Sequence, residues 1–410
     1  MEYSLAYNIG KIRNQIPNFS DICVMIQRIA KKKLIELAAS FKAVAVTGAR
    51  QTGKTTLVRE VFKKKPYVSL ENPDTRRFAI EDPRGFLQTY SEGAILDEVQ
   101  RVPELFSYLQ EVLDGSKETG KFILTGSNNF LLQENIGQTL AGRIATLNLL
   151  PFSIKELRKG KYMPEGDNEL MINGFYPPVY DQQIKAEDWC SNYVRTYIEK
   201  DVRQIKNITD LISFERFLYL LAGRSGQELN LSALSVEAGV DSKTIQSWIG
   251  ILESSFIIYL LRPHHRNFNK VIVKRPKVYF YDTGILCYLL GIKNVTHLSS
   301  HPLRGAIFEG MVITELIKER KNAGRDINLF FWRDKSGREI DVIIDDAGQL
   351  LPIEIKSGMT IHSEFFKNLD YWLALNQSEK SVVLYGGTER QKRSDGKEVM
   401  NWRTLEKTTL

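Results

Sequence analysis

The chain has 410 residues, of which 43% are hydrophobic and 26% are charged. These values are typical of a globular protein with two or three domains. The three cysteines are far apart in the sequence, so a disulfide framework is not expected and we predict a cytoplasmic location. No apolar run approaches the roughly 18 residues of a membrane span, and the N-terminus has no signal-peptide pattern. The net charge of +7 is compatible with a polyanion partner, but an ordinary basic surface explains it equally well.

The N-terminal part of the chain predicts an α/β domain. Residues 1–24 carry little pattern and are taken as an extension, and residues 25–41 predict a basic amphipathic helix whose apolar members include Leu34 and Ile35. Apolar strands then alternate with helices up to residue 151, a rhythm typical of a parallel sheet covered on both faces. The expected strands lie near residues 43–48, 67–70, 94–98, 121–127 and 144–150.

The segment "GARQTGKT" fits the pattern G-x-x-x-x-G-K-[ST] between a predicted strand and a predicted helix. Backbone N–H groups of such a loop converge on phosphate oxygens at a helix N-terminus. Lys54 would reach the β- and γ-phosphates, and Thr55 would supply a hydroxyl to Mg²⁺. The alternative is a plain strand–turn–helix. The candidate nucleotide-binding residues are Gly48, Ala49, Arg50, Gln51, Thr52, Gly53, Lys54, Thr55 and Thr56.

Acidic and polar residues follow the neighbouring predicted strands. Asp97 and Glu98 end the strand "AILDE", where Asp97 would hold the Mg²⁺ and Glu98 would orient or deprotonate the attacking water. Ser127, or less readily Asn128, ends the next strand and could contact the γ-phosphate, or could be an ordinary turn residue. Arg143 precedes the last strand of this domain and could project to the nucleotide of a neighbouring subunit, or could be a solvated arginine.

The rest of the chain predicts three further regions and a tail. Residues 152–230 read as a helical linker or lid, and 231–283 give two short helices and a hairpin, the order of a winged helix. Residues 284–390 are again α/β, and residues 391–410 are expected to be a poorly ordered tail. Such a winged helix would either contact DNA or mediate only domain or subunit contacts. The candidates for DNA contact are Ser242, Lys243, Thr244 and Gln246 on the second helix and Arg262, His264, His265 and Arg266 near the wing.

The stretches "VAVTGARQTGKTTLVREVF", "AILDEVQRVPELF", "LAGRIATLNLLPFSIKEL", "FFWRDKSGREIDVII" and "LPIEIKSG" resemble a large group of prokaryotic AAA+-type P-loop ATPases with an uncharacterised C-terminal domain. The resemblance covers about residues 25–390. It implies ATP and Mg²⁺ as cofactors, a finger-type role for Arg143, and a fold of three parts: a P-loop NTPase parallel sheet, a helical and winged-helix segment, and a small restriction-endonuclease-like α/β domain. Family members start near Met25, so residues 1–24 are either an extension or a start-codon error, which a mass measurement would decide.

The hairpin "GREIDVIIDDAGQLLPIEIKSG" is the candidate nuclease site that this resemblance implies. Asp341 and Glu354 on neighbouring strands would bind Mg²⁺, and Lys356 would help to position water, because alternate residues of a strand face the same side. Glu309 on a preceding helix, or alternatively Glu315, would complete the set. The hairpin could instead keep the fold without activity, or its charges could form ordinary ion pairs on a sheet.

These observations predict an ATP-hydrolysing AAA+-type protein that couples turnover to DNA binding or processing and forms homo-oligomers, with no membrane association. One alternative is a nucleotide-dependent switch or scaffold that binds a protein partner and carries an inactive nuclease fold. The other is a DNA-dependent enzyme of defence or mobile-element biology.

Overall fold

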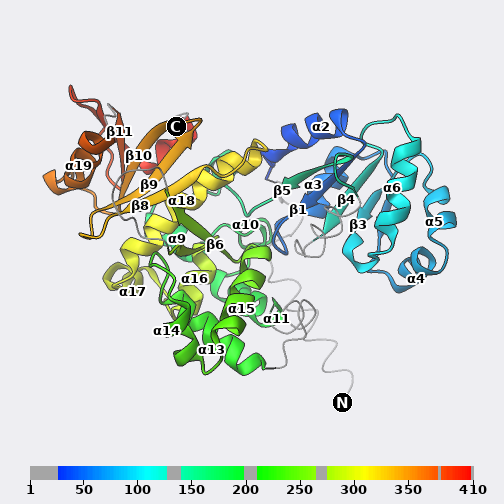
Figure 1. Cartoon of the computed structure of the whole chain (residues 1–410), viewed down its shortest axis with the longest axis horizontal. Coiled ribbons are helices and arrows are strands. Elements are labelled where there is room, and N and C mark those ends of the chain that lie inside the picture. Colours follow the sequence, from blue (N-terminus) through cyan, green and yellow to red (C-terminus); the bar gives the residue numbers. More distant parts are fainter. Residues whose placement is uncertain (1–25, 127–139, 198–209, 265–274, 377–379, 408–410) are drawn as a thin grey trace, which may run out of the picture.

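The computed structural model describes residues 26–126, 140–197, 210–264, 275–376 and 380–407. The first sheet and its helices lie at one end of the molecule, and the second sheet lies at the other end (Figure 1). A group of helices, among them α13 (Leu211–Ala222) and α15 (Ser242–Ser254), lies beside the two. None of the described helices is both long and apolar enough to cross a membrane.

The first sheet confirms the five strands expected in the N-terminal part. All neighbouring strands are parallel, in the order β2-β3-β4-β1-β5. The carboxyl ends of the parallel strands therefore meet at one edge, where β4 lies between β1 and β3. The strands are β1 (Ala43–Thr47), β2 (Tyr67–Ser69), β3 (Ile95–Asp97), β4 (Phe122–Gly126) and β5 (Ile144–Asn148).

Helices cover both faces of this sheet, as alternate side chains of β1 show. Ala43 and Ala45 pack into the core on one face, and Val44 and Val46 pack into the core on the other. Ile35 is 49% exposed, so the expectation that it belongs to the buried face of its helix is wrong. The covering helices are α2 (Ala30–Ser40), α3 (Lys54–Val61), α4 (Pro73–Glu81), α5 (Pro83–Thr89) and α6 (Leu105–Gly115).

Helices follow the first sheet, beginning directly after β5. The start of α15 is capped by Asp241, whose side chain accepts hydrogen bonds from the backbone N–H groups of Lys243 and Thr244. Besides α13 and α15, the helices are α8 (Ile154–Lys159), α9 (Asp167–Asn173), α10 (Pro177–Asp181), α11 (Ala186–Thr196) and α14 (Leu231–Ala238).

The second sheet is mixed and has eight strands in the order β12-β13-β11-β10-β9-β8-β6-β7. Its strands are β6 (Ile258–Pro263), β7 (Lys277–Phe280), β8 (Leu329–Arg333), β9 (Glu339–Asp346), β10 (Gln349–Lys356), β11 (Ser381–Tyr385), β12 (Gln391–Lys392) and β13 (Lys397–Asn401). The turn between β9 and β10 has positive φ at Ala347 and Gly348, as a two-residue hairpin turn requires.

The hairpin that was expected to form a wing belongs to this second sheet. β6 pairs with β7 on one side and runs parallel to β8 on the other. A single hydrophobic core also extends from Leu150 and the helices through β6 and β7 to Leu405. The expected boundary between residues 283 and 284 therefore does not separate two cores, because the hairpin completes the sheet of the region that follows it.

The expectation of a poorly ordered tail is wrong for residues 391–407. β13 pairs in parallel with β11, and a 3-10 helix, η4 (Trp402–Lys407), follows it. Trp402 is fully buried and its indole N–H donates to Asp167 Oδ2 at 3.1 Å. A polar segment is held here because Val399 and Met400, which point to opposite faces of the sheet, are each buried in a hydrophobic core.

Further helices complete the C-terminal part, and α18 is the longest of those that the structure describes. It packs against β5 and α2 of the first domain and against β10 of the second sheet. The elements are α16 (Thr283–Leu289), α17 (Val295–Ser300), α18 (Arg304–Asn322) and α19 (Lys367–Asn376), the last preceded by η3 (Ser363–Phe366).

Candidate functional site

The phosphate loop joins β1 to α3 at the carboxyl edge of the first sheet. Gly48 has φ +146°, and a Cβ there would lie 2.1 Å from the carbonyl oxygen of Leu149. Gly53, with φ +85°, precedes the first residue of α3. These two glycines are required because a side chain would collide with the backbone of Leu149, just after β5, at the first and would strain the backbone at the second.

The Lys54 side chain is buried inside the loop. Its Nζ donates to the carbonyl oxygens of Gly48 at 3.0 Å and Ala49 at 2.7 Å. The Thr52 hydroxyl also donates to Ala49 O, at 3.0 Å. An ammonium group is therefore held at the centre of the loop, where the phosphates of a nucleotide would be bound.

Asp97 lies at the end of β3, next to the N-terminus of α3. The hydroxyl of Thr55 donates to Asp97 Oδ1 at 2.9 Å, and the hydroxyl of Tyr67 donates to Asp97 Oδ2 at 2.8 Å. Thr125 on β4 also donates to Oδ1. Burial and the carboxylate raise the pKa of Tyr67 to about 12, so it remains a donor. A carboxylate and a hydroxyl on adjacent elements are oxygen ligands that suit Mg²⁺. The sequence predicted the pair Thr55 and Asp97, but nothing in the pattern indicated Tyr67 or Thr125.

Glu98 follows Asp97 with φ +55°, a left-handed conformation that ends β3. The side-chain amide of Gln100 donates to Glu98 Oε2. Gln100 in turn lies against Gly126, where a Cβ would come within 2.3 Å of its side-chain oxygen. Glu98 is thus oriented beside the end of β4. Ser127, the next residue of that strand end, lies outside the described residues.

Arg143 lies at the surface before β5. Its Nε donates to Asp114 Oδ1 at 2.5 Å, and its Nη2 donates to Oδ2 at 2.9 Å. Asp114 belongs to α6, which covers one face of the first sheet. Within one chain, Arg143 is therefore directed toward its own domain rather than into the phosphate loop.

Two side chains from outside the first sheet and its helices contact the loop, one at its backbone and one at a side chain. Arg28 Nη1 donates to Thr52 O at 2.6 Å, and the indole N–H of Trp189 on α11 donates to Gln51 Oε1 at 2.7 Å. Gln51 itself has φ +58°. A cavity of about 510 Å³ opens between the loop and α10 and α11, and Thr56 and Asp181 are among its lining residues. Burial raises the pKa of Asp181 to about 6, although Arg28 opposes this rise.

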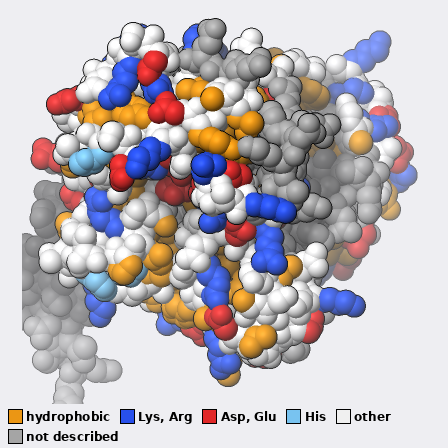
Figure 2. Space-filling model, turned by 60° about the vertical axis from the view of Figure 1, so that its left-hand side comes forward, with side chains coloured by type: hydrophobic (Ala, Val, Ile, Leu, Met, Phe, Trp, Pro, Cys, Tyr) orange, Lys and Arg blue, Asp and Glu red, His pale blue; other side chains and the backbone are white. Residues whose placement is uncertain are grey.

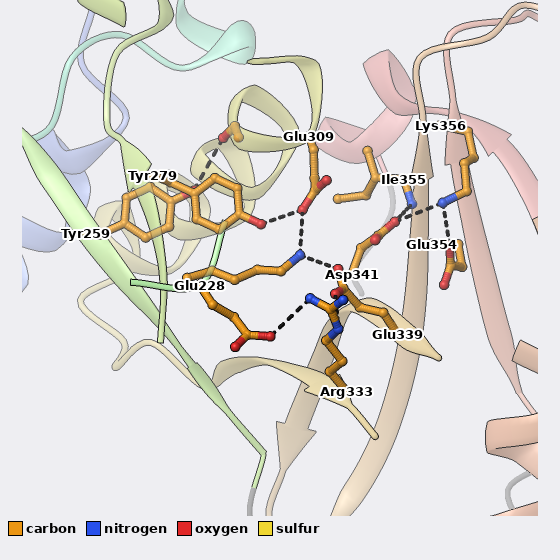
Figure 3. Close-up of polar contacts among 12 residues, drawn as sticks. Glu228, Tyr259, Tyr279, Glu309, Arg333, Glu339, Asp341, Glu354, Ile355 and Lys356 are labelled. Atoms are coloured by element: carbon orange, nitrogen blue, oxygen red, sulfur yellow. Dashed lines mark hydrogen bonds and ion pairs between the residues drawn. The ribbon is translucent and has the colours of Figure 1, made fainter. Parts of the chain in front are cut away.

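The hairpin β9–β10 brings three of the predicted C-terminal residues together (Figure 3). Lys356 Nζ contacts Glu354 Oε2 at 2.5 Å and Asp341 Oδ2 at 3.2 Å, and the backbone N–H of Ile355 donates to the same Asp341 oxygen at 2.7 Å. Burial, followed by the charge of Asp341, raises the pKa of Glu354 well above its usual range. Glu354 Oε1 is buried and has no hydrogen-bond partner among the described residues.

A second group of carboxylates lies on the other side of Asp341. One oxygen from each of Glu309, Glu339 and Asp341 lies within 4.8 Å of the others, close enough to hold a metal ion. Lys277 on β7 occupies the same place: its Nζ is 3.5 Å from Glu309 Oε1 and also contacts Glu339. Burial lowers the pKa of Lys277, but these carboxylates outweigh burial and raise it.

The protonation of Glu309 is strongly perturbed. Burial and then the charge of Asp341 raise its pKa against the opposing charge of Lys277, to a net value of about 7. The hydroxyl of Tyr279 donates to Glu309 Oε1. The cluster opens into a hollow of about 670 Å³ whose lining includes Arg333. We use the name acidic cluster for the four carboxylates and two lysines of this region, which are Glu309, Glu339, Asp341, Glu354, Lys277 and Lys356.

Of the two glutamates considered on α18, the structure brings only Glu309 to the acidic cluster. Glu315 Oε2 instead accepts a hydrogen bond from the backbone N–H of Ile154 at 2.8 Å, and Ile154 belongs to α8 rather than to the hairpin. Glu339 and Lys277 were missed as site residues. Glu339 was visible on the hairpin, two residues before Asp341, whereas Lys277 lies on a strand that no motif connects with the hairpin.

Some of the residues expected to contact DNA are exposed, and others are buried. Ser242, Lys243 and Gln246 are exposed on α15, as is Arg262 on β6. Thr244 is half-buried and its hydroxyl donates to Asp241 Oδ2 at 2.6 Å. His264 is 3% exposed and pairs with Asp345 at 3.1 Å, so the expectation that it contacts phosphates is wrong. His265 and Arg266 lie outside the described residues.

One face of the molecule shows how charge is distributed over the C-terminal part. In Figure 2, basic and acidic side chains are interspersed over the described surface, and small apolar areas lie between them. A nucleic-acid surface usually gathers Lys and Arg on one face. The described part of this face therefore offers no broad basic surface.

Comparison with known families divides the chain into three matched segments. Residues 40–158 match the model of an AAA domain. Residues 166–296 and 304–405 match two models that are each described as a domain of unknown function, DUF8612 and DUF4143. The last match includes residues 391–405, which agrees with the pairing of β13 in the second sheet.

Similar proteins occur in distant prokaryotes. An uncharacterized protein of Mycobacterium tuberculosis is 28% identical over 379 residues, which cover 91% of this chain and 83% of that protein. An uncharacterized protein of Haemophilus influenzae is 21% identical over 407 residues, which cover 91% of this chain and 97% of that protein. These similarities span nearly the whole chain.

Among solved structures, a Walker-type ATPase of Pyrococcus abyssi has a TM-score of 0.44 at 14% identity, covering 64% of this chain and 94% of that one. The ADP form of the Aeropyrum pernix ORC2 protein has a TM-score of 0.31 at 15% identity, covering 72% and 92%. Scores of this size are too low to carry a functional comparison. The AAA-domain match and the parallel sheet with its phosphate loop together support an AAA-type ATPase.

Proposed function

We propose that the chain hydrolyses ATP with Mg²⁺ at the loop Gly48–Thr55. The observation that carries this proposal is the hydrogen bond between Thr55 and Asp97 beside the buried ammonium of Lys54. The ammonium of Lys54, the hydroxyl of Thr55 and the carboxylate of Asp97 are groups that a triphosphate and its metal require, and all three lie at the same loop. A strand–turn–helix without this function would have no reason to bury a lysine against its own carbonyl groups.

The residues have separate roles in this reaction. The loop N–H groups and the N-terminus of α3 bind phosphate oxygens, and Lys54 exchanges the carbonyls of Gly48 and Ala49 for the β- and γ-phosphates. Thr55 and Asp97 would hold Mg²⁺, which neutralises phosphate charge when bound. Glu98, oriented by Gln100, accepts a hydrogen bond from the attacking water and removes its proton. The cavity lined by Thr56, Pro177 and Trp189 would hold the adenine base of the nucleotide.

The test separates nucleotide binding from hydrolysis. Lys54→Ala is expected to abolish ATP turnover, whereas Glu98→Gln is expected to keep nucleotide binding and lose turnover by about a hundredfold or more. Lys63→Ala is the control, because Lys63 is an exposed lysine shortly after α3. Turnover that survives Lys54→Ala would refute the assignment of the phosphate loop.

Homo-oligomerisation gives Arg143 its role in this proposal. The arginine would exchange Asp114 for the nucleotide of a neighbouring subunit and neutralise charge in the transition state. The exposed pairing with Asp114 supports this, because a solvent-screened salt bridge is readily exchanged. ATP turnover per chain should then rise with protein concentration, and Arg143→Ala should remove this rise.

A second candidate function is DNA binding or cleavage by the C-terminal part, moved by ATP turnover. The observation that favours it is the convergence of Asp341, Glu354 and Lys356, with Glu309 nearby and with Glu354 Oε1 buried without a partner among the described residues. Such oxygen atoms suit a hard cation. The exposed Ser242, Lys243 and Gln246 of α15 would contact DNA in the manner of a winged helix. Labelled DNA with Mg²⁺ or Mn²⁺, compared between wild type and Asp341→Ala, tests cleavage.

The alternative is a nucleotide-dependent switch that binds a protein partner through an inactive nuclease fold. Lys277 supports this alternative, because its ammonium already forms ion pairs with both Glu309 and Glu339. The interspersed surface charge in Figure 2 points the same way. Wild-type protein that leaves DNA intact, and whose ATP turnover is indifferent to DNA, would favour the switch. Stimulation by DNA would instead favour a DNA-dependent enzyme, as in defence or mobile elements.

A further inference from the structure

Arg28 is a buried residue between the phosphate loop and the segment that follows β5. It is 8% exposed and precedes the AAA-domain match. Its guanidinium donates to Thr52 O at 2.6 Å, to Leu150 O at 2.6 Å and, through Nε, to Glu156 Oε1 at 3.0 Å. One planar group therefore joins the loop to both ends of the segment 150–156.

Glu156 fixes the same segment from within. Its Oε1 also accepts from the backbone N–H of Ile29 at 2.7 Å, and its Oε2 accepts from that of Ser153 at 2.8 Å, which closes the capping box of α8. The side chain of Glu156 is fully buried. Loss of its partner Arg28 would leave a buried charge, so the arrangement resists separate movement of its members.

α18 holds this segment from the opposite side. Glu315 Oε2 accepts from the backbone N–H of Ile154 at 2.8 Å, and Lys318 Nζ donates to Phe152 O at 2.8 Å and to Glu315 Oε1 at 2.7 Å. The side chains of Glu315 and Lys318 are 4% and 1% exposed. The backbone of 150–156 is thus bonded to Arg28 on one side and to α18 on the other.

The same helix carries Glu309 of the acidic cluster. Glu309 precedes Glu315 by six residues, roughly 9 Å along the helix axis. Because a helix moves as a rigid element, a shift at Glu315 displaces Glu309 relative to Lys277 and Tyr279 on β7. The buried contacts therefore connect the phosphate loop with the acidic cluster through a single short segment and a single helix.

We propose that Arg28 is a positioning residue for the phosphate loop, and that through residues 150–156 it links nucleotide binding to the position of α18. The proposal rests on the proposed function, since it requires a nucleotide at the loop. When phosphate binding reorients the loop, the Thr52 carbonyl moves, and Arg28 must follow or leave buried acceptors unpaired. Nucleotide occupancy is then transmitted to the helix that carries Glu309.

Hydrogen exchange of the full-length chain tests this link, with and without Mg²⁺ and a non-hydrolysable ATP analogue. In the wild type, exchange should slow in peptides of the loop and in peptides of α18, each by about fivefold or more. In Arg28→Lys, which keeps a charge beside Glu156 but cannot reach three acceptors, the loop should still respond at saturating analogue. The α18 response should be lost, and the analogue should bind about tenfold more weakly.

Two further variants keep the test independent of the folding of Arg28→Lys. Glu315→Gln weakens the contacts at their α18 end. The loop should therefore keep its response and its affinity for the analogue, and the response of α18 should be reduced. Lys63→Met, a control at an exposed lysine shortly after α3, should behave like the wild type. An α18 response that persists in both Arg28→Lys and Glu315→Gln overturns the proposal, as does a wild type whose loop responds while α18 does not. A wild type in which the loop itself shows no protection refutes nucleotide binding instead.

Discussion

The phosphate loop and the acidic cluster are both groups of charged residues at the end of a sheet, but they are built in opposite ways. The loop residues are consecutive, and Lys54 satisfies itself on loop carbonyls that a substrate can replace. The acidic cluster is drawn from β7, α18, β9 and β10, and two lysines already pair with its carboxylates. The first site is arranged to receive an anion, whereas the second already holds cationic side chains among its carboxylates.

This difference indicates where a change should affect chemistry and where it should affect stability. A residue that contacts substrate can be lost with little damage to the fold, because water replaces the missing partner. A residue that neutralises buried charge cannot, because the remaining group stays unpaired. The two regions should therefore respond differently to the same kind of substitution.

The largest expected effect is on ATP turnover, which should fall when Asp97 is replaced but not when Asp341 is replaced. Asp97→Ala should lower kcat/KM for ATP about a thousandfold, close to 4 kcal/mol, because the metal loses its carboxylate. Asp341→Ala should change ATP turnover by no more than about twofold, because its carboxylate lies in the other region. Steady-state hydrolysis of ATP measures both. Equal losses in the two variants would show that the two regions do not act as separate sites.

Removal of Lys277 tests the acidic cluster, where a substitution is expected to affect stability. Lys277→Met leaves Glu309 and Glu339 without their buried counter-ion, which should destabilise the fold by about 3 kcal/mol. The melting temperature reports the loss. Millimolar Mg²⁺ should restore part of it, since the carboxylates would then bind the cation. The control is Arg338→Met, whose side chain is 48% exposed and pairs with Asp334 outside the cluster. An unchanged melting temperature in Lys277→Met would contradict its role as counter-ion.

A smaller effect is expected from Asp181, which lines the cavity beside the loop. Its pKa is raised from the ordinary 3.8 to about 6, so the folded state disfavours the charged form. The resulting loss of stability is complete above pH 6 and disappears as the pH falls toward 3.8. Asp181→Asn should therefore raise stability at pH 8 by about 1 kcal/mol after discounting for solvent screening, and by less at pH 4.5. Urea denaturation measures the difference.

The matched control for this prediction is Asp188→Asn on α11, where the aspartate is exposed. Its effect on the urea midpoint should be the same at both pH values. If Asp181→Asn likewise showed no dependence on pH, its carboxyl would not be disfavoured by burial.

The smallest expected change in stability concerns Asp114, the partner of Arg143 in an exposed pair. Asp114→Asn should shift the melting temperature by no more than about 2 °C, because exposed ion pairs contribute little. If Arg143 acts on a neighbouring nucleotide, the same variant should leave ATP turnover intact or raise it. A large fall in turnover would assign Asp114 itself to the site.

Much of the first domain could be read from the sequence because each feature is local. The order of apolar strands and helices predicted all five strands, and the loop pattern predicted where Lys54 and Thr55 would lie. Asp97 and Glu98 were found because the ends of parallel strands meet at one edge. Tyr67 and Thr125 were missed because hydrogen bonds across neighbouring strands leave no spacing signal in the chain.

The second sheet was harder because its members are brought together from far apart. Residues 391–407 looked like a tail, yet β13 completes the sheet beside β11. His264 looked like an exposed wing residue, yet β6 lies between β7 and β8 and buries it against Asp345. In both cases, strand pairing between distant segments outweighed a polar local sequence.

The amino-acid sequence by itself determined the parallel sheet, the phosphate loop and the residues that line it, since turn glycines and strand ends act over a few residues. Tertiary structure alone decided that Lys277 neutralises Glu309 and Glu339, that Glu315 faces Ile154 instead of the hairpin, and that Arg28 bridges the loop to residues 150–156. Such contacts depend on which buried charges meet when distant elements pack, and burial makes each of them require a partner that the local sequence does not name.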